Sequence, residues 1–214
     1  MLPYKTLTRL EVSIFEDSKK LSQQQRETCF AHIQSLQQQK KLIALSAFAT
    51  ATEIDTYGIT NALNLAITRG LALMTRKVMK GKLQIPSSYS AFRDTLLQLS
   101  TTQQIHFHLV IDGNRDFRLK NTFPTLDIMT IIKGDAKIKE IAMASIVAKV
   151  SRDNVMSSLP SKYHNYAFAQ HKGYGTAFHR AIIAKFGVSD IHRKLFLKQL
   201  FPQHCFQKQL PENF

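Results

Sequence analysis

The sequence lacks the features that would place it outside the class of globular domains. No apolar run approaches the roughly 18–20 residues that a membrane-spanning helix needs. Residues 1–20 lack the continuous apolar core of a signal peptide. There is no internal repeat, no low-complexity tract and no Gly/Ser-rich linker. Because 214 residues suffice for one domain with a full core, we expect a single cytoplasmic domain over residues 1–214.

Cysteine is also scarce. The chain has two cysteines, Cys29 and Cys205, which lie far apart and in no spacing typical of metal ligands. This pattern argues against a disulfide framework and against a zinc site. It favours buried or idle thiols in a reducing compartment.

Acidic residues are few compared with basic ones. The chain holds 15 Asp and Glu residues against 29 Lys and Arg residues, a formal net charge of +14. Such a field favours polyanionic partners, nucleic acid first and an acidic membrane surface second. The basic residues are spread along the chain and form no basic tail. A protein of high isoelectric point without a special partner is the alternative, because charge alone identifies no partner.

Hydrophobic periodicity and turn residues predict alternating helices and strands. A capping-box pattern at Ser22 and Gln25 begins a helix that runs to about Lys40. Apolar runs predict strands at residues 42–50, 105–111 and 128–132. Further helices are expected at residues 59–78, 89–99, 138–159 and 178–186, with a break at Pro86 and a partly helical tail from residue 191. This order predicts an α/β domain with a largely central sheet.

Two carboxylates follow predicted strands directly. Asp112 comes after IHFHLVI, and Asp135 comes after IMTII with only Lys133 and Gly134 between. In an α/β sheet, residues just beyond the strand ends line the site crevice. Converging carboxylates suit Mg²⁺ or Mn²⁺, and in a basic chain they indicate metal-assisted phosphodiester cleavage. Either Asp alone is more often a turn former or a helix cap, and that alternative stays open.

Six collinear segments resemble the bacterial ribonuclease HII family. They are DSKKLSQQQR (17–26), EIDTYGITNALNLA (53–66), VIDGN (110–114), KGDAK with AMASIVAKVSRD (133–153), HKGYGT (171–176) and IHRKLF (191–196). Each segment alone is a weak signal, but the ordered set is specific. The resemblance implies an RNase H-like fold, which is a mixed central sheet flanked by helices. It also implies a helical, substrate-contacting C-terminal portion over about residues 160–214.

The resemblance further implies an activity. It implies an endonuclease that cuts the RNA strand of RNA–DNA hybrids and single ribonucleotides embedded in duplex DNA. Cleavage on the 5′ side of the ribonucleotide would leave a 3′-hydroxyl and a 5′-phosphate, with Mn²⁺ or Mg²⁺ as cofactor. Asp112 matches the metal-binding Asp of the family's IDGN-type motif, and Asp135 matches the Asp of KGD. We expect both to be catalytic metal ligands, in a monomer that contacts no membrane.

The sequence departs from the family pattern at its N-terminal side. The family carries an Asp-Glu pair on its first strand, followed by a Gly-Arg-Gly turn. The 16 residues before Asp17 contain no Asp-Glu pair and no glycine. We therefore expect a chain without that strand, either because the sequence as given starts too late or because it is a decayed copy. Asp17 matches the DSK motif and is expected to organise the turn before Ser22.

This departure keeps three functions open. The first is the endonuclease. The second is a remnant that binds RNA–DNA hybrids without cutting them. The third is a basic RNA-associated structural protein, for which the ordered motifs would be coincidence.

One loop is expected to read the sugar. A protein separates RNA from DNA by contacting the 2′-hydroxyl. Tyr174 matches the family's tyrosine that stacks on a neighbouring sugar, and Gly173 and Gly175 leave the backbone room for a close approach. The alternative is a tyrosine in a flexible glycine loop without a partner.

Four basic residues are the expected phosphate contacts, although at least one of them should be a plain surface charge. They are Lys19, Lys20, Arg152 and Lys172. His171 and His179 are expected on a loop and on a helix surface, because hard cations prefer oxygen ligands. His192 in IHRKLF has a structural interpretation. Four phenylalanines are expected in the core: Phe15, Phe48, Phe107 and Phe123.

Overall fold

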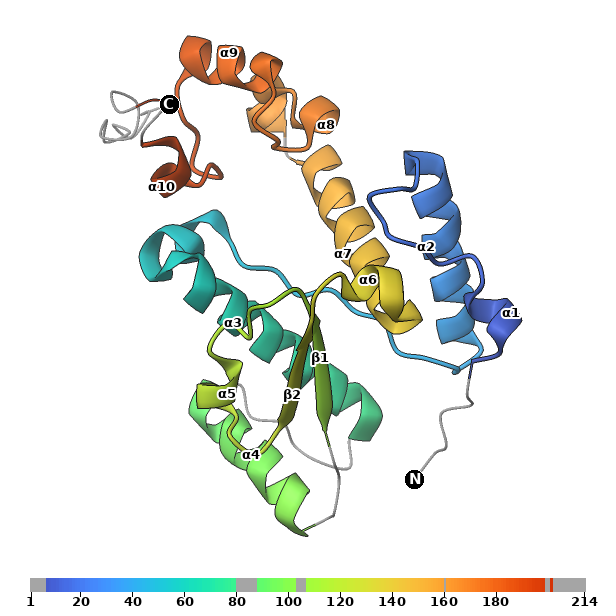
Figure 1. The fold of residues 1–214 in the computed structure, drawn as a ribbon. Coiled ribbons are helices and arrows are strands. Elements are labelled where there is room, and N and C mark those ends of the chain that lie inside the picture. Colours follow the sequence, from blue (N-terminus) through green and yellow to red (C-terminus); the bar gives the residue numbers. More distant parts are fainter. Residues whose placement is uncertain (1–6, 80–87, 103–106, 160, 199–200, 202–214) are drawn as a thin grey trace. The chain divides into compact units, whose positions relative to one another are not determined.

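The computed structural model describes the chain except for residues 1–6, 80–87, 103–106, 160, 199–200 and 202–214 (Figure 1). The chain divides into two compact units. Unit 1 comprises Met1–Phe48 and Leu63–Ser151, and unit 2 comprises Ala49–Ala62 and Arg152–Phe214.

The described residues form helices and one small sheet, labelled in Figure 1. The strands are β1 (His108–Asp112) and β2 (Asp127–Ile131). The longer helices are α2 (Gln23–Gln38), α3 (Ala51–Met79), α4 (Tyr89–Thr102), α7 (Lys139–Ser157) and α9 (Ala177–Phe186). The short helices are α1 (Arg9–Val12), α5 (Leu119–Thr122), α6 (Gly134–Lys137), α8 (Phe168–His171) and α10 (Lys194–Leu197), with a 3₁₀ helix at Ser161–Tyr166. No described helix is both long enough and apolar enough to cross a membrane.

The sheet confirms the predicted α/β class. β1 and β2 pair in parallel, with Leu109 opposite Ile128 and Asp112 opposite Ile131. One cluster of buried side chains covers the sheet, contributed by α4, α5, β2 and the segments beside them: Phe92, Leu96, Leu99, Leu119, Phe123, Leu126 and Ile128. Because parallel strands need a crossover, the chain between them passes through α5 before it returns to β2.

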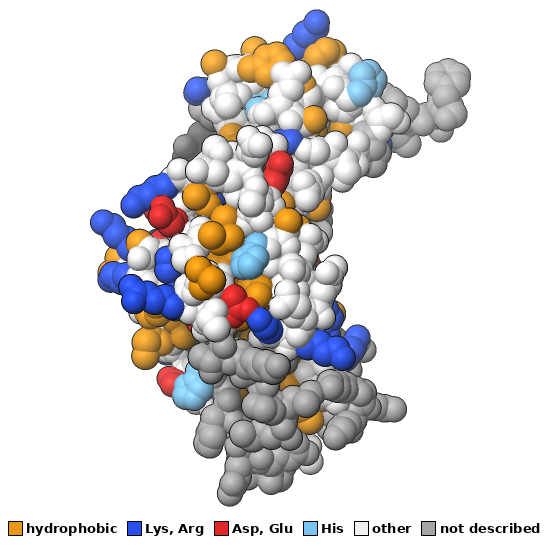
Figure 2. Space-filling model, turned by 90° about the vertical axis from the view of Figure 1, so that its right-hand side faces the viewer, with side chains coloured by type: hydrophobic (Ala, Val, Ile, Leu, Met, Phe, Trp, Pro, Cys, Tyr) orange, Lys and Arg blue, Asp and Glu red, His pale blue; other side chains and the backbone are white. Residues whose placement is uncertain are grey.

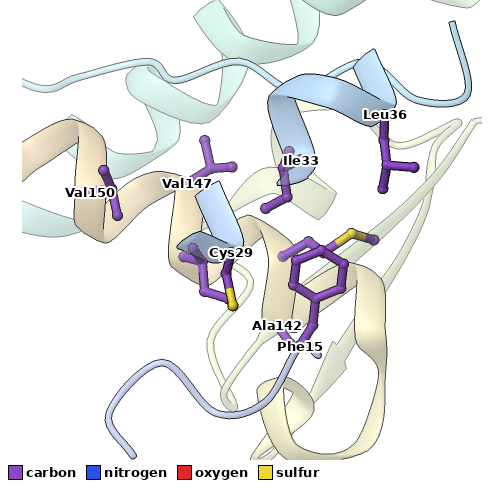
Figure 3. Packing of buried hydrophobic residues seen from close by; sticks show 9 residues of the cluster. Phe15, Cys29, Ile33, Leu36, Ala142, Val147 and Val150 are labelled. Carbon is purple, nitrogen blue, oxygen red and sulfur yellow. The ribbon is translucent and has the colours of Figure 1, made fainter. Parts of the chain in front are cut away.

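A second cluster joins α2 to the first part of α7, as Figure 3 shows. Cys29, Ile33 and Leu36 recur on one face of α2 and are at most 4% exposed. The ring of Phe15, which is fully buried, packs with them and with Ala142 of α7. Burying each large side chain contributes roughly 1.5–3 kcal/mol, so this contact holds α2 and α7 together.

The helices predicted from periodicity are confirmed. Ser22 is the N-cap of α2, and Gln25 completes the capping box. The helix expected at residues 59–78 is the larger part of α3, which Gly58 interrupts with φ of 76°. The helices expected at 89–99, 138–159 and 178–186 correspond to α4, α7 and α9. The break expected at Pro86 lies outside the described residues.

The strand predicted at residues 42–50 is wrong. This segment has no regular secondary structure and is mostly half-buried. Its polar groups bond to helical neighbours instead of a strand, since Ala44 N donates to Gln37 Oε1 at 2.6 Å and Ser46 Oγ donates to Ser151 Oγ at 2.7 Å. An apolar run predicts that a segment is buried. A strand also needs a neighbouring strand with which its backbone can pair.

Three of the four phenylalanines expected in the core lie there. Phe15 and Phe123 are buried, and Phe107 is half-buried beside the sheet cluster. Phe48 is 44% exposed, so its assignment to the core is wrong. Phe48 lies at the end of the irregular segment.

Candidate active site

The two predicted carboxylates meet at one edge of the sheet in unit 1. Asp112 is the last residue of β1, and Asp135 lies in the first turn of α6, which follows β2 after a short turn. Gly134 N donates a hydrogen bond to Asp112 Oδ1 at 2.8 Å, which places the two acids beside each other. Asp135 is only 5% exposed, whereas Asp112 is exposed. The structure therefore brings both residues to one edge of the sheet, where they were expected, and their role as metal ligands stays a prediction.

The glycine between them sits in a crowded position. A Cβ atom on Gly134 would lie 2.7 Å from Ile141 Cδ1 and 3.3 Å from Asp112 Oδ1. Any side chain at this position would push against the catalytic candidate Asp112 and against the first turn of α7. Gly134 thus lets the backbone N–H approach the Asp112 carboxylate directly.

Lys19 forms an ion pair with Asp135. Its Nζ lies 3.4 Å from Asp135 Oδ2, although the Lys19 side chain is 78% exposed. The negative charge of Asp135 is the main cause that raises the pKa of Lys19, and Asp17 and Asp112 add to it. Lys19 was expected to contact phosphate, and the structure places it at the carboxylate pair. Lys20, the next residue, is exposed.

Asp17 organises the turn that presents Lys19. Its Oδ1 accepts a hydrogen bond from Lys19 N at 2.9 Å, and its carbonyl accepts one from Lys20 N at 2.9 Å. The Lys19 N–H is also the main cause that lowers the pKa of Asp17, with a smaller contribution from Asp135. The sequence predicted the turn, but it missed that this turn brings Asp17 close to the site.

The donor chemistry of this edge fits a hard divalent cation. Asp112 and Asp135 offer only oxygen atoms, the ligands that Mg²⁺ and Mn²⁺ prefer. The ammonium of Lys19 already contacts one of these oxygens, which shows that the edge attracts a cation. In the described part of the chain, no group of three or more His, Cys, Asp or Glu residues is arranged to hold a metal.

The loop that carries Tyr174 lies in unit 2, between α8 and α9. Tyr174 N donates to the carbonyl of His171 at 2.8 Å, and Thr176 caps α9 by accepting from His179 N. Tyr174 is 49% exposed. Gly173 has φ of +74°, and a Cβ on Gly175 would meet nothing within 4 Å. The loop therefore has a defined backbone and an exposed aromatic ring.

Three histidines beneath this loop are buried, which corrects the expectation that two of them lie on the surface. His171, His179 and His192 are 5–7% exposed. They stack with one another and with Phe168, and the rings of His171 and His179 are 3.9 Å apart. The structural interpretation of His192 agrees with this burial.

Hydrogen bonds assign each imidazole a neutral tautomer. Ser189 N donates to His192 Nδ1 at 3.1 Å, so His192 carries its proton on Nε2 and donates to His179 Nε2 at 3.0 Å. His179 then donates through Nδ1 to the carbonyl of Tyr174 at 2.9 Å. Burial is the main cause that lowers the pKa of His192, to about 4, and it also lowers the pKa of His179. The sequence around each histidine gives no sign of this series of hydrogen bonds.

Two predicted phosphate contacts also lie in unit 2. Lys172 Nζ donates to Ser157 Oγ at the end of α7. The Arg152 guanidinium carbon lies 5.0 Å from the centre of the Tyr174 ring. The carboxylates and the other two predicted phosphate contacts belong to unit 1: Asp112, Asp135, Lys19 and Lys20.

Comparison with known proteins decides the family. The sequence model described as Ribonuclease HII matches residues 1–199. The chain belongs to the ribonuclease HII family. This confirms the resemblance carried by the six segments, and the RNase H-like fold that it implied.

Individual relatives support the same conclusion. A ribonuclease HII of Campylobacter concisus is 34% identical over 187 residues, which cover 87% of this chain and 79% of the relative. One of Shewanella piezotolerans is 36% identical over 182 residues, or 84% and 71% of the two chains. One of Chloroherpeton thalassium is 44% identical over 112 residues, or 52% of each chain. Within this ribonuclease HII family, Asp112 and Asp135 are the candidates for the catalytic acids.

Proposed function

We propose that the chain is an endonuclease that cleaves the RNA strand of RNA–DNA hybrids and single ribonucleotides embedded in duplex DNA. The products would be a 3′-hydroxyl and a 5′-phosphate. The observation that carries the proposal is the pairing of Asp112 with Asp135 at one sheet edge, joined through Gly134 N. Membership of the ribonuclease HII family supports the same substrate class.

The proposed mechanism assigns the two carboxylates to metal binding. Asp112 and Asp135 would hold Mn²⁺ or Mg²⁺, which when bound activates water and stabilises the leaving oxygen. Burial of Asp135 holds its carboxylate in one orientation, and Gly134 N orients that of Asp112. Lys19 balances their charge until substrate and cation arrive.

The remaining predicted residues would hold the duplex. Lys19, Lys20, Arg152 and Lys172 are the proposed phosphate contacts, and Tyr174 between Gly173 and Gly175 is the proposed sugar contact. The net charge of +14 supports a polyanionic substrate. On the face drawn in Figure 2, Lys and Arg side chains gather in groups and acidic side chains are sparse. The free, buried Cys29 is compatible with the proposed cytoplasmic, monomeric protein.

A cleavage assay tests this proposal. The substrate is a DNA duplex with one ribonucleotide, incubated with Mn²⁺ or Mg²⁺. We expect cutting on the 5′ side of the ribonucleotide, and we expect Asp112→Asn and Asp135→Asn each to abolish it. Asp127→Asn is the matched control, because Asp127 lies at the opposite end of β2 and pairs with His108 at 2.8 Å. Cleavage that survives both site variants would refute the assignment.

A second function is favoured by one observation. The net charge of +14 supports binding of a polyanion whether or not the strand is then cut. The alternative is a protein that binds RNA–DNA hybrids without cutting them. Salt-dependent binding of the hybrid by the unaltered chain, without cleavage in either metal, would indicate this second function.

A further inference from the structure

Arg152 lies against the proposed sugar-reading residue. Its guanidinium carbon is 5.0 Å from the centre of the Tyr174 ring, within the range of a cation–π contact. Arg152 comes from the last part of α7, and Tyr174 comes from the loop after α8. Both residues belong to unit 2, so this contact lies within one compact unit.

One guanidinium nitrogen of Arg152 is closed to a phosphate, although the side chain as a whole is 39% exposed. Nη1 is buried and has no hydrogen-bond partner, and it lies 3.9 Å from Asp153 Oδ1. A phosphate oxygen cannot contact an atom that has no accessible surface. A cation over an aromatic face is stabilised by the ring instead, which compensates in part for the missing hydrogen bond.

The loop is shaped around this contact. A Cβ atom on Gly173 would lie 3.3 Å from Arg152 Nη2 and 3.0 Å from Met156 Cε. Glycine at this position therefore lets the loop backbone approach α7 closely, at a φ that other residues rarely adopt. Next to it, Lys172 Nζ donates to Ser157 Oγ. The loop is thus fastened to the end of α7 on the side from which Tyr174 emerges.

We infer that Arg152 is a positioning residue that holds the Tyr174 ring ready for the sugar of the substrate. This inference rests on the proposed function of Tyr174. The guanidinium lies against the ring, while about half of the tyrosine surface, 49%, stays exposed for a ligand. A ring held in its binding orientation loses less conformational freedom when it stacks on a sugar. In this role Arg152 acts through Tyr174, in place of the direct phosphate contact proposed for it above.

A double-mutant cycle tests the inference. The full chain is assayed in EDTA for binding to a duplex with one ribonucleotide and to the same duplex in all-DNA form. We expect Arg152→Met to reduce the preference for the ribonucleotide about 2- to 5-fold, the effect of an exposed cation–π contact. In the Tyr174→Leu background the same change should have less than about a 1.5-fold effect, because the shared partner is gone.

Two further variants separate stacking from charge. Tyr174→Phe keeps the ring, so its preference should still depend on Arg152. Arg152→Lys keeps the charge but not the planar stacking surface, and should restore the preference only in part. Arg193→Met is the matched control, because Arg193 lies 4.2 Å from the Phe196 ring in the same unit. It should leave the preference unchanged, and thermal melts show whether each variant folds.

Each result decides between the roles. An equal loss in both Tyr174 backgrounds, with a salt slope reduced by about 1, would show a direct phosphate contact and overturn the inference. A preference for the ribonucleotide that does not depend on Arg152 would overturn the role inferred for Arg152 and leave the sugar-reading role of Tyr174 intact. An unaltered chain that binds both duplexes equally would refute the sugar-reading role of Tyr174, and with it both this inference and that part of the proposed function.

Discussion

Acid should weaken the fold of unit 2 by protonating the buried, hydrogen-bonded histidines His179 and His192. His192 is 6% exposed, and burial lowers its pKa from 6.5 to about 4. The folded chain therefore holds His192 neutral, while the unfolded chain takes up a proton near pH 6.5. Because the unfolded state binds more protons between these values, stability is complete above pH 6.5 and falls as the pH drops toward 4.

The size of the effect follows from this pKa difference. Between pH 7.5 and pH 5, His192 alone should lower the free energy of unfolding by about 2 kcal/mol, since each pKa unit corresponds to about 1.4 kcal/mol. His179, whose pKa is also lowered, acts in the same direction. A proton on His179 Nε2 would face the N–H of His192 and break the hydrogen bond between the two rings.

Urea unfolding followed by circular dichroism at pH values from 5 to 7.5 measures this effect. The substitution His192→Phe keeps an aromatic ring beside Tyr166 and Phe168 but removes the titrating group. It should cost stability at pH 7, because Ser189 N loses its acceptor, and it should flatten the dependence on pH. His108→Gln is the control, because His108 is exposed at the start of β1. An unchanged pH dependence in His192→Phe would refute the reasoning.

Three further substitutions test the packing and the site. Gly134→Ala should reduce cleavage more than it reduces stability. The new Cβ would press on Asp112 Oδ1 at 3.3 Å, whereas the end of the Ile141 side chain can shift. Parallel cleavage assays and urea melts compare the two losses. Ile33→Ala should lower the free energy of unfolding by about 2–5 kcal/mol, since Ile33 is 1% exposed between α2 and α7; urea unfolding measures it. Ser22→Ala should cost about 1 kcal/mol in the same assay, because α2 loses its capping box.

These substitutions can also fail in informative ways. Full cleavage by Gly134→Ala would show that Asp112 need not keep its bond to Gly134 N. A cost below about 1 kcal/mol for Ile33→Ala would show that the α2–α7 contact relaxes around the lost atoms. Gln24→Ala is the matched control for Ser22→Ala, because Gln24 is exposed in the first turn of α2.

Local signals predicted most of the elements and the carboxylate pair. The capping residues Ser22 and Gln25 fixed the start of α2, and apolar runs located β1 and β2. The carboxylate pair followed from a topological rule, because residues after parallel strands share one edge of a sheet.

Features that depend on contacts between distant residues were missed. The segment 42–50 is apolar and mostly half-buried, but its backbone forms no strand, so composition alone did not predict its conformation. The burial of His171 and His179 depends on His192, which lies 13 residues beyond His179 and is hydrogen-bonded to it. The approach of Arg152 to Tyr174 depends on Gly173, whose role is visible only when α7 and the loop are both in place.

The thiol packed between α2 and α7 can report when that contact opens. Cys29 is 4% exposed, and burial raises the pKa of its thiol, so the reactive thiolate is scarce in the folded chain. In a Cys205→Ser background, the rate at which a thiol reagent labels Cys29 would therefore follow the opening of α2. This gives a kinetic probe of local unfolding that needs no nucleic acid and no metal.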